Sequence, residues 1–370
     1  MIMKVAVIVG ARPQFIKAAP LIRELQATPD CEVVFIHSGQ HFDENMSAVF
    51  FRELELPEPK HHLGIHSGGH GQMTGRMLAA IEVCLLAEKP DRVVVFGDTN
   101  TTLAGALAAA KLGIPRAHVE AGLRSWDRSL PEELNRVLVD HCSTWLFCPT
   151  DQAVQNLSAE GIRQGVHLVG DIMFDAVRLF SSKARARTQL LDGLGLKPRD
   201  YFVLTIHRTY NTEDASVLTS ILRACAALPG RVLFPVHPRT RPLLAQAGTI
   251  PDNVIISEPL GYLDMLCVAS NCRCMLTDSG GLQREAYFLG VPCVTLRPET
   301  EWVETVSAGW NVLAGTDTNR IVRSVGQIER ASRRHIACFG DGRSAEIVCK
   351  HLQALPASDY SASSLANTAS

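Results

Sequence analysis

The chain has 370 residues, a length that favours two domains over a single core. Apolar residues make up 46% of it and charged residues 20%, which is typical of a globular protein, and no apolar stretch is long enough to cross a bilayer. A formal net charge of -2 predicts no broad basic surface for nucleic acid or for acidic membranes.

The 11 cysteines are scattered along the chain and include no Cys-x-x-Cys pair. This pattern predicts reduced thiols in a cytoplasmic protein, with no bound metal. The first residues are predicted to form a β-strand and not a signal peptide, because the apolar run is short and no small-residue cleavage pattern follows it.

Short β-branched runs alternate along the chain with longer amphipathic stretches. In the first part of the chain, strands are predicted over Lys4–Val9, Glu32–His37, Arg92–Phe96, Arg116–Val119 and Trp145–Cys148. After Gly170 the same alternation restarts, with strands predicted over Tyr201–Ile206, Arg231–Val236, Val254–Ile256, Cys274–Leu276 and Cys293–Leu296. The intervening amphipathic stretches include Phe15–Gln26, Thr102–Leu112, Glu132–Ser143 and Ala215–Ala227.

Apolar strands that alternate with helices predict the α/β class, with parallel sheets covered by helices on both faces. The restart predicts two doubly wound, Rossmann-like domains over residues 1–171 and 172–340. We expect a helix over 341–355 to pack back on the first domain, and a disordered tail over 356–370. In such folds ligands bind at the carboxyl ends of the strands, so the site is expected in a cleft between the domains.

The stretch LTDSGGLQREA combines a strand end with the start of a predicted helix. Ser279, Gly280 and Gly281 stand at the helix N-terminus, where free N–H groups and the helix dipole favour a phosphate. Glu285, more than one turn further, is placed to accept hydrogen bonds from ribose hydroxyls. The alternative is that Ser279 is only a helix cap and Glu285 only a solvated side chain.

Charged residues also follow the strands of the first domain. GARPQFIK places Arg12 and Lys17 after the first strand, and it matches neither the dinucleotide fingerprint nor a P-loop, which disfavours an oxidoreductase. Asp98 follows the third strand, Glu120 the fourth, and Glu132 lies in the next predicted helix. We therefore expect three carboxylates to converge on one site.

The second domain repeats this placement with histidine and arginine. TIHRTYNTED places His207 and Arg208 after its first strand, and PVHPRTR places His237 after the next one. The first domain thus carries acids, and the second carries groups that can donate hydrogen bonds to a phosphate. Together these residues indicate a ligand site more strongly than any one of them does.

Several motifs together resemble the non-hydrolysing UDP-N-acetylglucosamine 2-epimerases, over nearly the whole chain. They are GARPQFIKAAP, GDTNTTLAGALAA, HVEAGLRS, PEELNR, HR after a strand, HPRT and TDSGGLQREA. The resemblance implies the two-domain GT-B fold of many nucleotide-sugar glycosyltransferases, a UDP-sugar substrate, no cofactor, no metal, and a homodimer.

One branch of that family is most similar. It acts on UDP-2,3-diacetamido-2,3-dideoxy-glucuronate, gives the manno epimer, and serves bacterial surface polysaccharide (O-antigen) synthesis. The signs are GARPQFIK, HSGQHFDENMSAVFF, HGQMTGRML, a short loop between Arg124 and Pro131, and ETEWVE where relatives usually have Glu-Arg-Pro-Glu. Trp302 thus replaces an expected arginine, while Arg297 and Glu301 are expected to line the site.

The resemblance also implies how the reaction proceeds and which residues carry it. UDP leaves C1 while the C2 proton is removed, and UDP then adds back to the glycal with a proton from the other face. The catalytic set is Asp98, Glu120, Glu132 and His207, the three acids carrying the protons. The expected contacts of the UDP-sugar are Arg12, Lys17, Arg136, Arg208, His237, Ser279, Gly280, Gly281, Glu285 and Arg297.

Other functions stay open from the sequence alone. They are UDP-N-acetylglucosamine as the substrate, a retaining GT-B glycosyltransferase, a hydrolysing epimerase, and a non-catalytic nucleotide-sugar sensor. A second, activating UDP-sugar beside Gly39, Gln40, His41, Arg76 and His237 is also left open. Arg128, in the short loop, is a speculative candidate for binding the C6 carboxylate.

Overall fold

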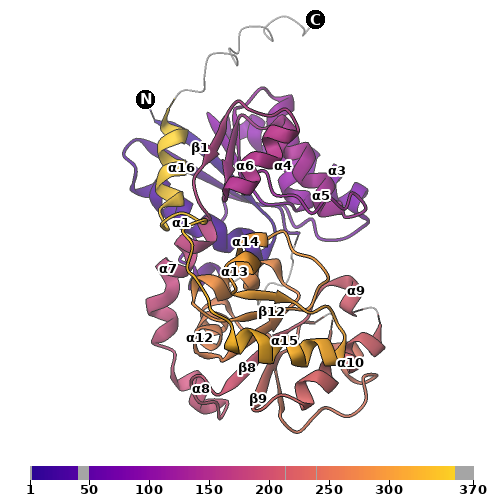
Figure 1. Cartoon of the computed structure of the whole chain (residues 1–370). Coiled ribbons are helices and arrows are strands. Elements are labelled where there is room, and N and C mark those ends of the chain that lie inside the picture. Colours follow the sequence, from indigo (N-terminus) through magenta and orange to yellow (C-terminus); the bar gives the residue numbers. More distant parts are fainter. Residues whose placement is uncertain (1, 41–49, 213, 239, 355–370) are drawn as a thin grey trace, which may run out of the picture. The chain divides into compact units, whose positions relative to one another are not determined.

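The structure of the protein is a computed structural model that describes residues 2–40, 50–212, 214–238 and 240–354. Its contacts divide the chain into two compact units. Unit 1 comprises Met1–Ala176 and Cys338–Ser370, and unit 2 comprises Val177–Ala337. Figure 1 labels the main elements of each unit.

Unit 1 is built, within the described residues, on a seven-stranded parallel sheet with the order β3-β2-β1-β4-β5-β6-β7. The strands are β1 (Met3–Val9), β2 (Cys31–His37), β3 (His61–His62), β4 (Arg92–Phe96), β5 (Arg116–Val119), β6 (Trp145–Cys148) and β7 (Val166–Leu168). The helices are α1 (Arg12–Ala27), α3 (His70–Glu88), α4 (Asn100–Lys111), α5 (Pro131–Cys142), α6 (Asp151–Ala159) and α16 (Ser344–Gln353).

Both faces of this sheet are buried, as the continuous apolar strands predict. Alternate residues of the central strands, such as Ile8 and Val95, pack in one core with Ile81 of α3 and Ala108 of α4. The residues between them, such as Val7, are equally buried on the opposite face, which α1 contacts. The charged residues that follow the strands are therefore held on a rigid sheet.

Unit 2 contains a second parallel sheet, of six strands in the part of the chain that is described, with the order β10-β9-β8-β11-β12-β13. The strands are β8 (Tyr201–Thr205), β9 (Arg231–Pro235), β10 (Val254–Ser257), β11 (Cys274–Thr277), β12 (Cys293–Thr295) and β13 (Asn311–Leu313). The helices are α8 (Gln189–Gly193), α9 (Thr209–Thr212), α10 (Ala215–Ala226), α11 (Arg241–Leu244), α12 (Tyr262–Asn271), α13 (Gly280–Phe288), α14 (Val303–Ser307) and α15 (Thr318–Arg330).

Two separate cores cover the faces of the unit 2 sheet. Phe202 and Leu276 pack with α10 and α15 on one face, while Val203 and Met275 pack with α12 on the other. Neighbouring residues of one strand thus point into different cores. Each predicted strand of this unit is present and starts at the predicted residue, and its end differs from the prediction by one residue.

Three strands were not predicted from the sequence, namely β3, β7 and β13. Each has only two or three residues, and each lies at an edge of its sheet. Edge strands this short carry too few apolar residues to produce a readable alternation.

The unit boundary differs from the predicted division after residue 171. The helix α7 (Ile172–Arg185) runs across it, and its first turn belongs to unit 1 because Ile172 and Ala176 are buried there. The chain returns to unit 1 at Cys338, where the Asp171 N–H donates to the Phe339 carbonyl over 2.9 Å. The tail predicted over 356–370 lies outside the described residues.

The helix α16, inside the stretch predicted over 341–355, packs against α1 and lies beside it in Figure 1. Its first turn is fixed by a hydrogen bond from the Ala345 N–H to Asp175 Oδ2 over 2.8 Å. The helix α16 therefore extends the face of unit 1 that α1 covers.

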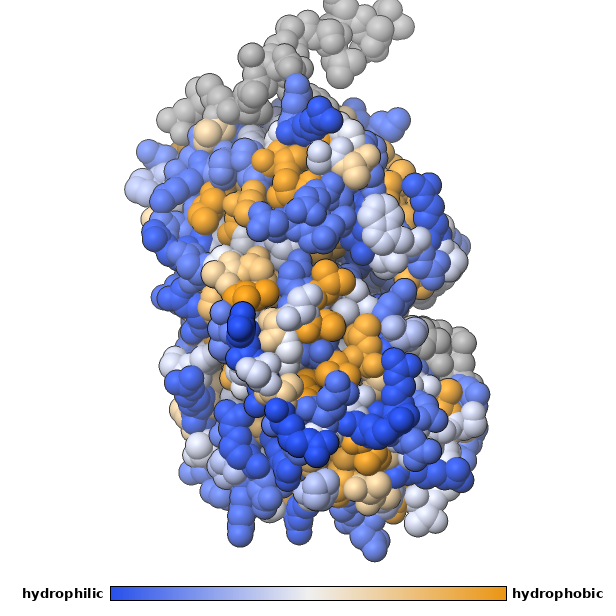
Figure 2. Space-filling model, viewed as in Figure 1, coloured by the Kyte–Doolittle hydropathy of each residue, from blue (hydrophilic) through white to orange (hydrophobic). Residues whose placement is uncertain are grey.

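Hydrophilic residues cover much of the face drawn in Figure 2, and hydrophobic residues form smaller groups among them. No helix in the described parts of the chain is long and apolar enough to cross a membrane. All 11 cysteines lie within the described residues, and all are free thiols.

Candidate active site

Two of the predicted catalytic acids stand on neighbouring strands of unit 1. Asp98 follows β4 and Glu120 follows β5, and these strands pair in parallel with Phe96 opposite Val119. The two loops are also joined directly, since the Gly97 N–H donates to the Val119 carbonyl over 3.0 Å. The structure therefore places these acids at one edge of the sheet.

Glu120 is held by Lys17 of α1. The Lys17 ammonium donates a hydrogen bond to Glu120 Oε2, and both side chains are only 7% exposed. The Glu120 backbone has φ of 77°, a left-handed conformation that is strained for a residue with a side chain. Strain of this kind gathers at functional positions, and a proton-transfer role of Glu120 stays a prediction.

Gly97 makes room for this ion pair. Its φ of 63° is left-handed, and a Cβ atom there would lie 3.0 Å from Glu120 Oε2 and 3.2 Å from Lys17 Nζ. A side chain at position 97 would press on the glutamate that follows the neighbouring strand.

Asp98 is held by Arg136 of α5. The Arg136 guanidinium donates to Asp98 Oδ2, and it also lies 3.3 Å from Glu133 Oε2. The Asp98 side chain is 28% exposed, so it remains accessible while it is paired. Lys17 and Arg136 were predicted to contact the UDP-sugar, and the structure places both cations on the acids; their contact with substrate stays a prediction.

Glu133, which the sequence analysis passed over, is more deeply involved than Glu132. It is 1% exposed, and its carboxylate accepts hydrogen bonds from the Ser125 N–H over 2.9 Å and the Trp126 N–H over 3.1 Å. The Glu132 side chain is partly exposed, and within the described residues it makes no hydrogen bond or ion pair. The structure thus brings together Asp98 and Glu120 with their cations, and a proton-transfer role of Glu132 stays a prediction.

A buried histidine and a buried aspartate contact the loops that follow β4 and β5. These loops carry Asp98 and Glu120, and we call them the two acidic loops. His118 Nδ1 is 2.6 Å from Asp140 Oδ1, and His118 Nε2 is 2.7 Å from the Gly97 carbonyl oxygen. Asp140 Oδ2 accepts from the Gly122 N–H over 3.1 Å. The pair therefore contacts the backbone beside both Asp98 and Glu120.

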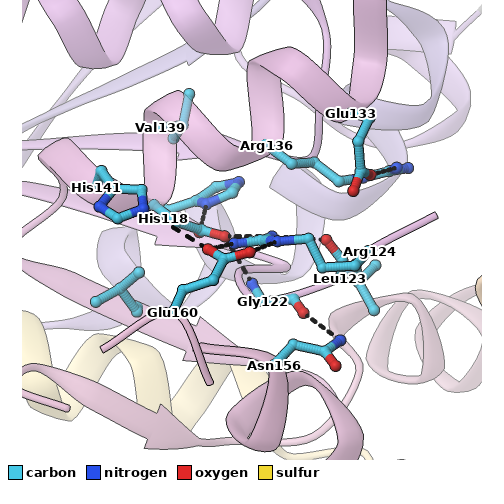
Figure 3. Close-up of polar contacts among 12 residues, drawn as sticks. His118, Gly122, Leu123, Arg124, Glu133, Arg136, Val139, His141, Asn156 and Glu160 are labelled. Atoms are coloured by element: carbon cyan, nitrogen blue, oxygen red, sulfur yellow. Dashed lines mark hydrogen bonds and ion pairs between the residues drawn. The ribbon is translucent and has the colours of Figure 1, made fainter. Parts of the chain in front are cut away.

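The same aspartate is paired with Arg124, which Figure 3 shows beside Glu160 and His118. Arg124 Nη1 donates to Asp140 Oδ2 over 2.8 Å, and its Nε and Nη2 both donate to Glu160 over 2.7 Å. Burial alone would raise the pKa of Asp140, but the charges and hydrogen bonds of His118 and Arg124 outweigh it and lower that pKa. Asp140 is therefore a carboxylate inside the protein.

The loop after β1 is organised by Gln14. Its Oε1 accepts from the Gly10 N–H over 2.8 Å and the Ala11 N–H over 3.0 Å, while its Nε2 donates to the Phe96 carbonyl over 2.8 Å. Arg12, predicted to bind substrate, is the first residue of α1, and its guanidinium lies 4.4 Å from the centre of the Phe50 ring.

In unit 2 the loop after β8 is organised by Asp278, a further residue that the sequence analysis did not assign. This fully buried carboxylate accepts from the backbone N–H of Arg208 over 2.9 Å and of His207 over 3.0 Å. His207 Nδ1 lies 3.0 Å from its Oδ1. Burial by itself raises the pKa of Asp278, but the hydrogen bonds and charge of His207 and the other donors have a larger, opposite effect. The pKa of Asp278 is lowered as a result, so this carboxylate is ionised. The side chain of His207 is 36% exposed, and its ring centre is 5.9 Å from that of His237.

The helix α13 begins as the TDSGG stretch predicts. Ser279 is its N-cap, with the hydroxyl accepting from the Leu282 N–H over 3.4 Å. A Cβ atom on Gly280 would lie 2.8 Å from Glu301 Oε1, so a larger residue does not fit there. Glu301 in turn pairs with Arg297 over 3.0 Å. The helix cap that the sequence offered as the alternative role of Ser279 is therefore present. Phosphate binding by Ser279, Gly280 and Gly281 stays a prediction.

Glu285 lies on α13 and is buried, with 4% of its surface exposed. The alternative of a solvated side chain is therefore wrong. The pKa of Tyr262 is raised well above its ordinary value, first by burial and then by the negative charge of Glu285. The ribose contact predicted for Glu285 is not tested by these observations.

Two of the residues considered for a second UDP-sugar, Gln40 and Arg76, make hydrogen bonds within unit 1. Gln40 Oε1 accepts from the Thr101 N–H over 3.1 Å, and Arg76 donates to the Ser67 carbonyl. His41 lies outside the described residues. Arg128, the candidate for a sugar carboxylate, is exposed. In the described residues there is no group of three or more His, Cys, Asp or Glu side chains that would hold a metal ion.

The family model for UDP-N-acetylglucosamine 2-epimerase matches residues 23–353. The chain belongs to the UDP-N-acetylglucosamine 2-epimerase family. This epimerase is 48% identical to a UDP-N-acetylglucosamine 2-epimerase homolog of Methanococcus maripaludis, a match that covers 95% of this chain and 100% of the relative. It is 45% identical, over 95% and 100% of the two chains, to the UDP-2,3-diacetamido-2,3-dideoxy-D-glucuronate 2-epimerase of Pseudomonas aeruginosa.

A solved structure agrees with this assignment. The Methanocaldococcus jannaschii UDP-GlcNAc 2-epimerase, in complex with UDP-GlcNAc and UDP, matches the epimerase with a TM-score of 0.88 and 43% identity over 95% of this chain and 99% of that one. The predicted family and the α/β, GT-B-type fold of two Rossmann-like domains are confirmed. The protein is an isomerase, a non-hydrolysing UDP-sugar 2-epimerase, and the transferase, hydrolase and sensor alternatives are set aside.

Proposed function

We propose that this epimerase converts UDP-2,3-diacetamido-2,3-dideoxy-α-D-glucuronate to its manno epimer, in the synthesis of a bacterial surface polysaccharide such as O-antigen. The alternative substrate is UDP-N-acetylglucosamine. Relatives with each name are similar in identity to this chain, so overall similarity does not separate the two sugars.

The residue that supports the uronate is Trp302. Plain UDP-N-acetylglucosamine relatives usually have an arginine in this motif, whereas Trp302 is 2% exposed and lies under the Arg284 guanidinium, 3.8 Å from its ring centre. A cation stacked on an indole is held in place by the ring's electron density. This contact holds the Arg284 guanidinium at a fixed position in unit 2, and we propose that this guanidinium binds the carboxylate of the sugar.

The two acid–cation pairs of unit 1 carry the chemistry. The C2 proton of a sugar that has no neighbouring carbonyl is barely acidic, so its removal has to accompany departure of UDP from C1. The C2–H and C1–O bonds break, a C1–C2 double bond forms, and one carboxylate takes the proton. UDP then re-forms the C1–O bond while the other carboxylate supplies a proton to the opposite face of C2.

We assign these proton transfers to Asp98 and Glu120, with Glu132 as a third candidate. Arg136 and Lys17 hold these two carboxyl groups in place. One of the two gives up a proton when the other has taken one, and exchange with solvent restores the starting state. Two carboxylates at neighbouring strand ends match a reaction that needs proton exchange on both faces of one carbon.

Unit 2 supplies the UDP-binding residues in this proposal. Ser279, Gly280 and Gly281 hold a phosphate at the start of α13, and the buried Glu285 accepts from the ribose hydroxyls. His207, whose orientation Asp278 fixes, and Arg208, His237 and Arg297 stabilise the charge of the departing UDP, together with Arg12.

The substrate is tested by competition between the two UDP-sugars at equal concentration. Because the sugars compete for one enzyme, the ratio of product formation gives the ratio of kcat/KM directly. We expect the uronate to be favoured by at least about tenfold, which corresponds to about 1.4 kcal/mol. A preference for UDP-N-acetylglucosamine would overturn the uronate proposal and leave the epimerase chemistry in place.

We also propose that the enzyme works in the cytoplasm as a homodimer. Light scattering behind a size-exclusion column measures this assembly. A mass of twice 40.3 kDa supports the dimer, and a mass of 40.3 kDa contradicts it.

A further inference from the structure

We propose that His118 is the positioning residue of the two acidic loops, and that it acts as a doubly protonated imidazolium between Asp140 and the Gly97 carbonyl. This inference rests on the proposed roles of Asp98 and Glu120. His118 itself does not touch substrate, because its side chain is fully buried.

The hydrogen bonds require two donors on the His118 ring. Its Nε2 faces the Gly97 carbonyl oxygen at 2.7 Å, and its Nδ1 faces an oxygen of Asp140 at 2.6 Å. A carbonyl oxygen and an ionised carboxylate only accept hydrogen bonds, and a neutral imidazole has only one N–H. Both contacts are therefore hydrogen bonds only when both ring nitrogens carry protons.

The surroundings of the ring balance its charge. Asp140 accepts from His118, from Arg124 over 2.8 Å and from the Gly122 N–H over 3.1 Å, so both of its oxygens face donors. Glu160 closes the network by binding Arg124 through two hydrogen bonds of 2.7 Å. Two cations, His118 and Arg124, thus meet two anions, Asp140 and Glu160. A buried imidazolium is stable in such a neutral set.

This network ties down both acidic loops from one point. Gly97 immediately precedes Asp98, and its carbonyl accepts from His118. Gly122 lies two residues after Glu120, and it is held on both sides: its N–H donates to Asp140, and its carbonyl accepts from Asn156 over 2.9 Å. Figure 3 shows His118, Gly122 and Arg124 gathered around this point.

The helix α5 adds a second connection. It carries Asp140 and, one turn earlier, Arg136, which pairs with Asp98. A shift of the His118–Asp140 pair would therefore move Asp98 in two ways: through the neighbouring Gly97 carbonyl, and through Arg136 on α5. A displacement of about 1 Å of a catalytic group costs on the order of 10²-fold in rate.

Two substitutions separate the two hydrogen bonds of His118. The amide nitrogen of asparagine overlaps the position of His118 Nδ1, so His118→Asn keeps a donor toward Asp140 and loses the Gly97 contact. The amide nitrogen of glutamine overlaps Nε2, so His118→Gln keeps a donor toward Gly97. The matched control is Val139→Ala on α5, which removes two methyl groups from a fully buried core side chain next to Asp140.

The measurements are kcat, KM, the dissociation constant of UDP and the unfolding temperature, with whichever UDP-sugar the wild-type enzyme converts. We expect His118→Asn to lose about 10²-fold in kcat, with KM and UDP affinity nearly unchanged. His118→Gln should recover most of that loss, and Val139→Ala should lower the unfolding temperature while keeping wild-type kcat. Wild-type kcat in folded His118→Asn would overturn the proposal, as would equal losses in His118→Asn and Val139→Ala.

The wild-type protein gives an independent test if His118→Asn does not fold. In a spectrum of ¹⁵N-histidine-labelled enzyme at neutral pH, a buried histidine should show two protonated ring nitrogens that exchange slowly with solvent. The absence of any such histidine would overturn the imidazolium. If the wild-type enzyme converts neither UDP-sugar, the proposed function fails, and this spectrum still tests His118 separately.

Discussion

Two ion pairs set the charge at the carboxyl ends of the unit 1 strands: Lys17 with Glu120, and Arg136 with Asp98. Burial differs between them, since the Glu120 side chain is 7% exposed and that of Asp98 is 28% exposed. The two carboxylates thus differ in their access to solvent, and the proposed mechanism likewise gives them different tasks at the two faces of C2.

Asp98→Asn and Glu120→Gln are expected to lower turnover by about 10²–10⁴-fold, because an amide neither takes nor returns a proton. Each amide keeps an oxygen that accepts from the neighbouring cation, so the fold should survive. The dissociation constant of UDP should stay close to the wild-type value in both variants, since the proposed UDP contacts lie mostly on unit 2. Wild-type turnover in either variant would remove that residue from the mechanism.

The two neighbouring glutamates of α5 allow a matched comparison. Glu132→Gln tests the predicted third acid, whereas Glu133→Gln weakens the hydrogen bonds that hold Ser125 and Trp126. If Glu132 carries a proton, its variant should lose kcat without losing stability. Normal turnover in Glu132→Gln would exclude that role, whatever Glu133→Gln shows.

Glu285→Ala is expected to weaken UDP binding by about tenfold or more, because hydrogen bonds to a charged group contribute about 1.5–3 kcal/mol. The exposed Glu299, in the loop after β12, provides the control. Calorimetric titration with UDP should show weaker binding for Glu285→Ala and unchanged binding for Glu299→Ala. An unchanged dissociation constant in Glu285→Ala would refute the ribose contact.

At the scale of single elements, Asp175, which binds the first turn of α16, makes the free energy of unfolding depend on pH. Burial raises the pKa of Asp175 from 3.8 to about 6, although the hydrogen bond from the Ala345 N–H opposes the shift. The folded protein then binds a proton between these pH values that the unfolded chain has already lost. This contribution to stability is full below pH 3.8 and disappears as the pH rises to about 6.

Asp175→Asn should therefore remove that dependence, because an amide does not titrate. Thermal unfolding of both proteins from pH 4 to pH 7 measures the difference between them. Relative to the variant, the wild-type protein should lose stability as the pH rises through about 6. A constant difference over this range would show that Asp175 has an ordinary pKa in the folded protein.

The sequence predicted the central elements well and the supporting contacts poorly. Buried parallel strands are continuous apolar runs, so their ends, and with them Asp98 and Glu120, were readable. The roles of His118 and Asp278 were not, because both act on backbone groups that only the folded chain brings near. The spacing of Glu133, Arg136 and Asp140 was a usable signal, since positions i, i+3 and i+7 share one helix face.

At the scale of the whole molecule, the proposed mechanism assigns different tasks to the two units. Unit 1 carries two acids with their cations on one sheet, and unit 2 carries the start of α13 and the Asp278–His207 pair on another. The proposed reaction uses both sets of residues. We therefore predict that damage to the acids spares UDP binding, and that damage to Glu285 lowers affinity more than it alters the proton transfers.

The most direct test of this account is proton NMR of the wild-type reaction in D₂O, followed at C2 of the UDP-sugar. We predict that the manno product carries deuterium at C2, that UDP returns to the sugar, and that deuterium also enters the remaining starting material. A manno product that keeps its original C2 proton would contradict proton exchange by Asp98 and Glu120, and with it the central claim.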